Sequence, residues 1–410
     1  MLQMGFAAHV IASFAQVTIT RDVYGSGDIM VYWAEGVALA DALRYDFSGI
    51  APGLIDVFLH REGRLPFELY GGGATASQSV FSAFLQFVTG NSLYASSILL
   101  AMLALLGKAG IYSALKNDFE PEVRPRLGAA IVLLPSAVYW CGSLAKEAVA
   151  IAFFGILTWA LRTIFERRSI AIALGAAVLS ATIVAMIKAY ILLAFSLSAG
   201  VWLYWSVQQK RTGTVVVKPV FLLLGAALAV GGITLVGRLN PEYGAEQVRE
   251  RATKQAMYGA SAGGDSYYEL ASGTDEERPL SQQLALAPAG LFTALFRPLL
   301  FEARSAMVFI NAIESTGLFV VALIILRRLG FRGVWERISS SPSLMFCLVF
   351  SVSFGSAVGV LTTNLGTLSR YRAPMMPLFA GLLAVLWMES LAARRRAAAV
   401  AEQRPRALAY

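Results

Sequence analysis

The sequence predicts an all-α protein that crosses a membrane many times, and its composition and apolar patterning support this. Of its 410 residues, 57% are hydrophobic and only 15% are charged, and the mean hydropathy is +0.62. A soluble domain typically carries about 25% charged residues. A chain of this length cannot hide so much apolar surface from water in a core, so lipid must cover part of it.

Ten apolar stretches approach the length of about 20 residues that a membrane-spanning helix needs. They make residues 1–410 a single transmembrane domain of about ten helices. The first stretch has no basic segment before it and no small-residue cleavage pattern, so we expect a retained helix rather than a signal peptide. The predicted spans are 5–20, 94–115, 127–141, 147–165, 170–187, 190–207, 215–236, 305–326, 342–362 and 374–391.

Lysine and arginine gather in alternate short loops, and this alternation predicts the orientation of the chain. Cytoplasmic loops of membrane proteins carry an excess of these residues, so both termini are expected in the cytoplasm, with 392–410 as a basic tail. The net charge of +8 then reflects these loops, and no basic stripe with interleaved aromatic residues suggests nucleic acid. The basic side contains Lys108, Lys116, Arg124, Arg126, Arg162, Arg167, Arg168, Lys210, Arg211, Arg327, Arg328, Arg332, Arg337, Arg394, Arg395 and Arg396.

The first of two long extracytoplasmic segments runs over residues 21–93. Apolar residues recur at roughly helical spacing over 37–43. Such a stretch predicts a helix that lies flat in the membrane interface, with Tyr32 and Trp33 at the level of the lipid headgroups.

Two acids stand near the start of this segment. Asp28, with Asp22 nearby, supplies a carboxylate that could act as a general base for an acceptor hydroxyl. The glycines around Asp28 would allow the backbone to approach a ligand closely. The alternative is a solvated loop acid that caps the following helix.

A lysine and a glutamate occupy a very short outer turn after Pro135, which is expected to bend the preceding helix near its outer end. Lys146 runs against the positive-inside trend and could pair with a lipid-linked pyrophosphate, beside Glu147. Lys188 is another cation on the same side. The alternative for these residues is a set of side chains that extend to the membrane interface.

The second extracytoplasmic segment, 237–304, has a middle part at 258–277 that reads as a mobile loop, and its apolar end at 288–302 is expected to return to the membrane surface. Arg297 could bind phosphate, with Glu302 beside it. Glu314 falls inside a predicted span and therefore needs a partner or a wet cavity. The alternative is an internal Arg–Glu network that fastens the loop to the bundle.

Two arginines on the outer side directly precede the last predicted span. Arg370 and Arg372, with Tyr371 between them, suit a phosphate or diphosphate leaving group, because fixed positive charge stabilises a developing negative charge. The alternative is binding of lipid headgroups by interfacial arginines.

Cysteine and histidine are too sparse for a disulfide framework or a structural zinc site. Cys141 and Cys347 both lie in apolar stretches, and His9 and His60 are far apart in the sequence. No metal ligand is therefore assigned and no cofactor is required, while assistance by a divalent metal ion stays an open alternative.

The chain resembles the GT-C superfamily of polyprenyl-phosphate-dependent glycosyltransferases in the order of its elements. A short first helix is followed by an outer loop with Asp28 near its start and then by an interfacial helix. Residues 370–377 (RYRAPMMP) resemble the late segment of those enzymes that leads from an outer loop into a helix. The stretches 135–147 and 296–302 are similar to membrane proteins of bacterial exopolysaccharide gene clusters, and Wzy-type polysaccharide polymerases are a related likeness.

The resemblance implies a GT-C-like enzyme of the bacterial inner membrane that takes an undecaprenyl-linked sugar or oligosaccharide as donor at the extracytoplasmic face, in cell-surface polysaccharide biosynthesis. Asp28 would activate an acceptor hydroxyl, while Arg370, Arg372, Lys146 and Arg297 would hold the lipid phosphate or pyrophosphate. Membrane lipid and other polysaccharide-assembly proteins are the further partners expected.

The sequence also departs from this family. GT-C loops often carry paired acids, but Ile29 follows Asp28, so the partner would have to be Asp22 or Glu35. No large soluble C-terminal domain is present, which favours a polymerase-like or lipid-directed role over transfer of one sugar to a protein. Two other classes stay open: a transporter or flippase of a lipid-linked or anionic solute, and a non-catalytic subunit of a polysaccharide-synthesis complex.

Overall fold

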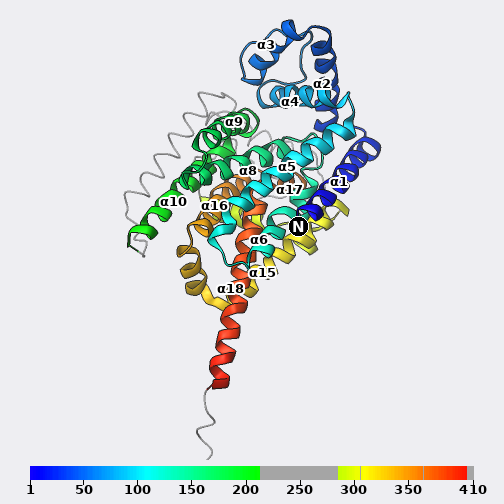
Figure 1. Cartoon of the computed structure of the whole chain (residues 1–410). Coiled ribbons are helices and arrows are strands. Elements are labelled where there is room, and N and C mark those ends of the chain that lie inside the picture. Colours follow the sequence, from blue (N-terminus) through cyan, green and yellow to red (C-terminus); the bar gives the residue numbers. More distant parts are fainter. Residues whose placement is uncertain (213–284, 305, 363, 404–410) are drawn as a thin grey trace, which may run out of the picture.

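The computed structural model is all-helical over the residues it describes, as the sequence predicts (Figure 1). The predicted span at 215–236 and the predicted loop at 258–277 lie outside the described residues. The described residues are 1–212, 285–304, 306–362 and 364–403.

Eight helices in the described part are long and apolar enough to cross a membrane, so the chain is a polytopic membrane protein. They coincide with eight of the ten predicted spans. Between 22% and 61% of each apolar window is buried inside the protein, which leaves the other faces for lipid. The eight are α1 (Leu2–Thr18, continued by the π-helix η1, Ile19–Tyr24), α5 (Leu93–Leu115), α8 (Lys146–Phe165), α9 (Ile170–Lys188), α10 (Tyr190–Thr212), α15 (Ala306–Ser339), α16 (Pro342–Leu361) and α18 (Met376–Gln403).

The prediction of one continuous span at 127–141 is wrong. Helix α6 (Arg124–Leu133) ends after 10 residues, and α7 (Pro135–Tyr139) adds little more than one turn. Pro135 has no backbone N–H and disfavours helical geometry in the residue before it, and Leu134 accordingly has a ψ of 120°. The proline therefore breaks the helix, whereas the sequence predicts only a bend.

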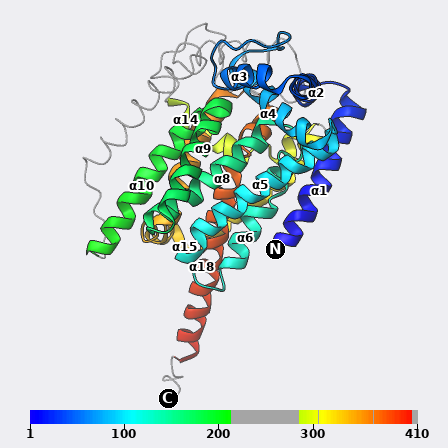
Figure 2. The same ribbon diagram turned by 45° about the horizontal axis from the view of Figure 1, so that its top comes forward.

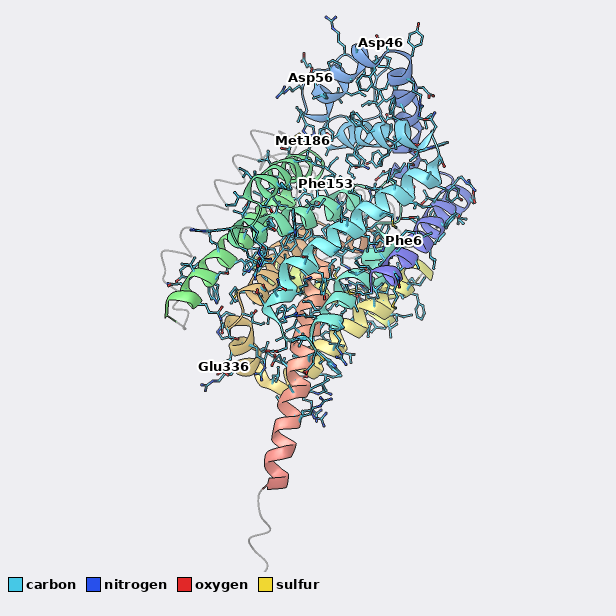
Figure 3. All side chains as sticks on the ribbon, viewed as in Figure 1. Phe6, Asp46, Asp56, Phe153, Met186 and Glu336 are labelled. Carbon is cyan, nitrogen blue, oxygen red and sulfur yellow. The ribbon has the colours of Figure 1, made fainter. Side chains whose placement is uncertain are left out.

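The core of the bundle lies where α8, α10 and α16 meet. Phe154 packs against Phe350 with 4.8 Å between ring centroids, and Trp202 packs against Phe346 at the same distance. On the outside, Phe6 of α1 is 55% exposed (Figure 3). Apolar side chains thus occupy both the core and the surface, as lipid rather than water around the helices requires.

Three helices form a small unit, here called the cap (residues 28–89), at one end of the bundle (Figures 1 and 2). It has its own apolar core, in which Leu39, Leu54 and Val80 are fully buried. The first cap helix covers the residues 37–43 for which the sequence predicts a helix, while the other two are not anticipated. The cap consists of α2 (Asp28–Tyr45), α3 (Phe47–Phe58) and α4 (Gly73–Thr89).

The end of the second long segment packs against the bundle. Helix α14 (Ala287–Phe296) lies against α16, and an added Cβ at Gly290 would meet the backbone nitrogen of Val360 at 2.9 Å. Small residues permit such close helix contact in membranes. The short turn η4 (Leu300–Glu302) follows it, with Phe301 85% exposed. That 288–302 returns to the membrane surface stays a prediction.

Helix ends divide between a cap end and an opposite, basic end of the bundle. The start of α8, the end of α9 and the short helix α17 (Leu365–Tyr371) lie at the cap end. The start of α1 and the end of α18 lie at the basic end (Figure 2). The predicted tail at 392–410 begins there as the last turns of α18. That the basic end faces the cytoplasm stays a prediction from the loop charges.

Helices α5 and α8 touch at two glycines, and this contact yields a stability prediction. An added Cβ at Gly155 would lie 2.0 Å from the carbonyl oxygen of Gly107, so one backbone must shift. We expect Gly155→Ala to lower the free energy of unfolding by about 1–3 kcal/mol, measured by thermal unfolding in detergent. The matched control is Gly175→Ala, where nothing lies within 4 Å of the added Cβ. Equal stability of Gly155→Ala and Gly175→Ala would contradict the close contact between α5 and α8.

Candidate functional site

A buried carboxylate, Glu147, lies at the centre of a charged cluster at the cap end. Its side chain is 0% exposed, and it lies in the first turn of α8, where the helix dipole favours negative charge. Oε1 accepts a hydrogen bond of 2.6 Å from Nζ of Lys188, and Oε2 forms an ion pair of 2.9 Å with Nε of Arg370. A buried carboxylate is costly unless it is paired, and here each oxygen faces a cation.

Lys188 reaches Glu147 because α8 and α9 are neighbouring helices of opposite direction. It lies in the last turn of α9, where the helix dipole favours a cation. Its ammonium also lies 4.8 Å from the ring centroid of Tyr371, a cation–π contact. The Lys188 side chain is only 5% exposed, so its ammonium faces Glu147 and Tyr371 rather than solvent.

Arg370 joins the bundle to the cap. It lies in the last turn of α17, whose start is capped by the Asn364 side chain. Beyond its ion pair with Glu147, its Nη1 donates a hydrogen bond of 2.8 Å to Oδ2 of Asp28, the first residue of α2. The Asp28 side chain is 56% exposed and that of Arg370 is 22% exposed. One guanidinium thus bridges a buried carboxylate of the bundle and an exposed carboxylate of the cap.

Burial and charge fix the protonation of two groups here. Burial by itself lowers the pKa of Arg370, but Glu147 and Asp28 outweigh it and raise that pKa above its ordinary value. Burial, with the charge of Asp28, raises the pKa of the Tyr32 phenol above its ordinary value. Arg370 is therefore a permanent cation, and Tyr32 is a neutral phenol near neutral pH.

Lys146 adds a third cation beside this cluster. Its ammonium donates a hydrogen bond of 2.9 Å to Oγ1 of Thr75, just inside the start of α4, and lies 5.7 Å from the ring centroid of Tyr32. It is within electrostatic reach of Asp28 and Arg370. Within the described residues, the cluster contains the cations Lys146, Lys188 and Arg370 and the carboxylates Asp28 and Glu147, which leaves one positive charge in excess.

Arg297, Glu302 and Arg372 form a different group, which holds α14 in place. Arg297 pairs with Glu302 at 2.5 Å. Arg372 is fully buried, and its guanidinium donates to the carbonyl oxygens of Ala294 and Arg297 and to the hydroxyl of Ser315. Carbonyls at a helix end need donors from outside the helix. These contacts match the alternative of an internal network for Arg297 and Glu302. Binding of a phosphate by Arg297 or Arg372 stays a prediction from the sequence.

Glu314 and Asp22 are engaged elsewhere. Glu314 accepts hydrogen bonds from the backbone N–H of Ser136 at 2.7 Å and from its hydroxyl at 2.5 Å, which joins α15 to α7. Asp22 pairs at 2.6 Å with its neighbour Arg21, and both side chains are 46% exposed. The structure therefore brings Asp28, Lys146, Glu147, Lys188, Arg370 and Tyr371 together out of the predicted site residues.

The placement of Lys108 beside a cytoplasmic loop is wrong. Lys108 is fully buried on α5, and its Nζ donates to Nε2 of His9 at 3.1 Å and to the carbonyl oxygen of Ala137 at 3.0 Å. Nδ1 of His9 lies 2.7 Å from the carbonyl oxygen of Gly5, which leaves Nε2 as the acceptor. A lysine within an apolar run is the signal that could have revealed this pair, because such residues require partners inside the membrane.

The charged cluster offers the two functions that group transfer to a hydroxyl requires. Asp28 presents a solvent-exposed carboxylate that can accept a proton. Arg370 and Lys146 present fixed positive charge that can bind a phosphate. Within the part of the chain that the structure describes, no three His, Cys, Asp or Glu side chains gather closely enough to hold a metal ion.

Comparison of the chain with protein-family models, with curated proteins and with solved structures found no match.

The buried Lys108–His9 pair yields a second prediction. His9→Leu leaves the buried Lys108 amine without its ring partner, and we expect the free energy of unfolding to fall by about 1–3 kcal/mol. Adding Lys108→Met should restore most of that loss, because no buried amine then lacks a partner. Thermal unfolding in detergent measures both variants, with Arg332→Gln as the control because the Arg332 side chain is 92% exposed. A double variant less stable than His9→Leu alone would refute the pairing.

Proposed function

We propose that this protein is a membrane glycosyltransferase that uses an undecaprenyl-linked sugar or oligosaccharide donor at the extracytoplasmic face, as a polymerase or as a single-sugar transferase in cell-surface polysaccharide biosynthesis. In this proposal the chain lies in the bacterial inner membrane with both termini in the cytoplasm. Other polysaccharide-assembly proteins are its expected partners.

One observation carries the proposal: Arg370 is held between the buried Glu147 and the exposed Asp28. An arginine fixed on one edge by a buried carboxylate keeps its orientation without further ordering, and its planar fork matches phosphate oxygens. Lys146 supplies the excess positive charge beside it. An anion with more negative charge than one carboxylate therefore suits this site.

The position of the cluster fits a substrate with an apolar tail. The cluster lies where membrane-spanning helices α8 and α9 meet the cap, so apolar helix surface extends away from it on the bundle side. A polyprenyl chain can lie along such a surface while its phosphate stays at the polar end. The loop charges predict that this end faces the extracytoplasmic side.

The reaction follows from these positions. Asp28 accepts the proton of an acceptor hydroxyl, whose oxygen forms a bond to the anomeric carbon of the donor sugar. The bond from that carbon to the phosphate oxygen breaks, and the electron pair leaves with the lipid phosphate or diphosphate. Arg370 and Lys146 stabilise the negative charge that develops on this leaving group. Glu147 and Lys188 act by positioning Arg370.

Substitution of the cluster tests this function. We expect Arg370→Gln to lower glycan formation about 100-fold or more, as loss of a fixed charge at a developing anion does. Asp28→Asn should lower it by about 100-fold or more through loss of the base. The measurement is incorporation of radiolabelled sugar into glycan by membranes that contain equal amounts of each variant.

Asp56→Asn is the matched control, because it removes the same charge from the cap at a side chain that is 41% exposed on α3. Its glycan formation should equal that of the wild type. Wild-type amounts of radiolabelled glycan from both Arg370→Gln and Asp28→Asn would refute the proposal.

A transporter or flippase of a lipid-linked or anionic solute is the second candidate, and the buried Lys108–His9 pair favours it. Ionisable residues inside a membrane often mark ion or proton pathways. A transporter would move the lipid-linked donor across reconstituted vesicles without forming glycan, and Lys108→Met would stop this movement. Movement of the donor that is unchanged in Lys108→Met would argue against a transport role for the Lys108–His9 pair.

A further inference from the structure

The two partners of Arg370 differ sharply in how firmly they are held. Glu147 is fully buried, and its second oxygen is bound by Lys188 at 2.6 Å. Separation from Arg370 would leave its other oxygen, Oε2, without a cation in an apolar interior. The inner edge of the guanidinium is therefore permanently occupied.

Asp28 is the exchangeable partner. Its side chain is 56% exposed, so water can solvate the carboxylate once it separates from Arg370. The backbone before it is open: Gly25 has a φ of +67° and Gly27 a φ of +132°, with nothing within 4 Å of an added Cβ at either position. As the first residue of α2, Asp28 keeps the favourable field of the helix N-terminus after separation.

A phosphate group is a stronger ligand than Asp28 for the same edge of Arg370. It carries more oxygens than a carboxylate, a diphosphate also carries more charge, and an arginine fork binds either through two parallel hydrogen bonds. Lys146 reaches the same region and is free of a carboxylate partner in the part of the chain that the structure describes. Its charge attracts an incoming anion.

We propose that the Asp28 carboxylate and the phosphate of the donor compete for the outer edge of Arg370. This inference rests on the proposed function and adds a regulation to it. Donor binding displaces Asp28, and the displaced carboxylate then has both oxygens available to accept the proton of an acceptor hydroxyl. While Asp28 stays bound to Arg370, one of its oxygens is occupied by a charged hydrogen bond. The base is thus released only when the donor is in place.

Competition makes a prediction that a purely catalytic Asp28 does not make. Asp28→Asn removes the competing charge and should lower the dissociation constant of a phosphate ligand by about threefold to fivefold, the value of a partly exposed ion pair. Asp28→Ser should show the same gain. Asp56→Asn, which removes an equal charge elsewhere in the cap, should leave the constant unchanged. Glu147→Gln should raise it, because Arg370 loses its anchor.

Calorimetric titration of the purified full-length protein in detergent measures these constants. Inorganic pyrophosphate and farnesyl pyrophosphate serve as separate probes, because one lacks and the other carries an isoprenoid tail. A gain in Asp28→Asn and Asp28→Ser with either probe supports the competition, and a gain confined to farnesyl pyrophosphate assigns it to lipid-linked ligands.

Unchanged or weaker binding in both Asp28 variants overturns the competition, as does an equal gain in Asp56→Asn or the absence of binding to every variant with both probes. The radiolabelled-glycan assay separates this result from the proposed function. Tighter binding in the Asp28 variants without glycan formation by the wild type would overturn the glycosyltransferase and retain the competition.

Discussion

The arrangement of the cap end depends on the burial of the Glu147 carboxylate. A carboxylate with 0% exposure at the edge of an apolar bundle is tolerable only with partners on both oxygens. Lys188 from α9 and Arg370 from α17 supply them. The ion pairs therefore fix where the end of α9 and the last turn of α17 must lie relative to the start of α8, and they orient the guanidinium that the proposed chemistry uses.

The cap is tied to this same point by polar contacts. Asp28 bonds to Arg370, Thr75 accepts from Lys146, and the amide nitrogen of Gln78 donates to the carbonyl oxygen of Leu144 at 3.1 Å. All three contacts end on the turn before α8, on its first residue or on the arginine paired to it. The charged cluster and the cap are therefore joined by three polar contacts at one place.

Arg370 and Arg372 are separated by one residue but make contacts in different parts of the fold. Arg370 faces Glu147 and Asp28, whereas Arg372 is buried against the last carbonyls of α14. Residues two apart at a helix end project in different directions. The sequence motif around them does not show that one faces the cap while the other fastens α14. The same limit applies to Arg297, which follows the end of α14 and pairs with Glu302 in the next turn, η4.

The sequence by itself determined the class of this protein. Hydropathy located the eight described spans, because each membrane-spanning helix must be apolar along its own length to face lipid. It also singled out Lys146 and Arg370, because their predicted positions run against the positive-inside trend of the loops. Only the tertiary structure decided which charges meet. Asp28 and Arg370 are 342 residues apart, and Lys108 of α5 contacts His9 of α1. Such pairs arise from packing of whole helices, and no local pattern specifies which distant acid or base will share a buried position.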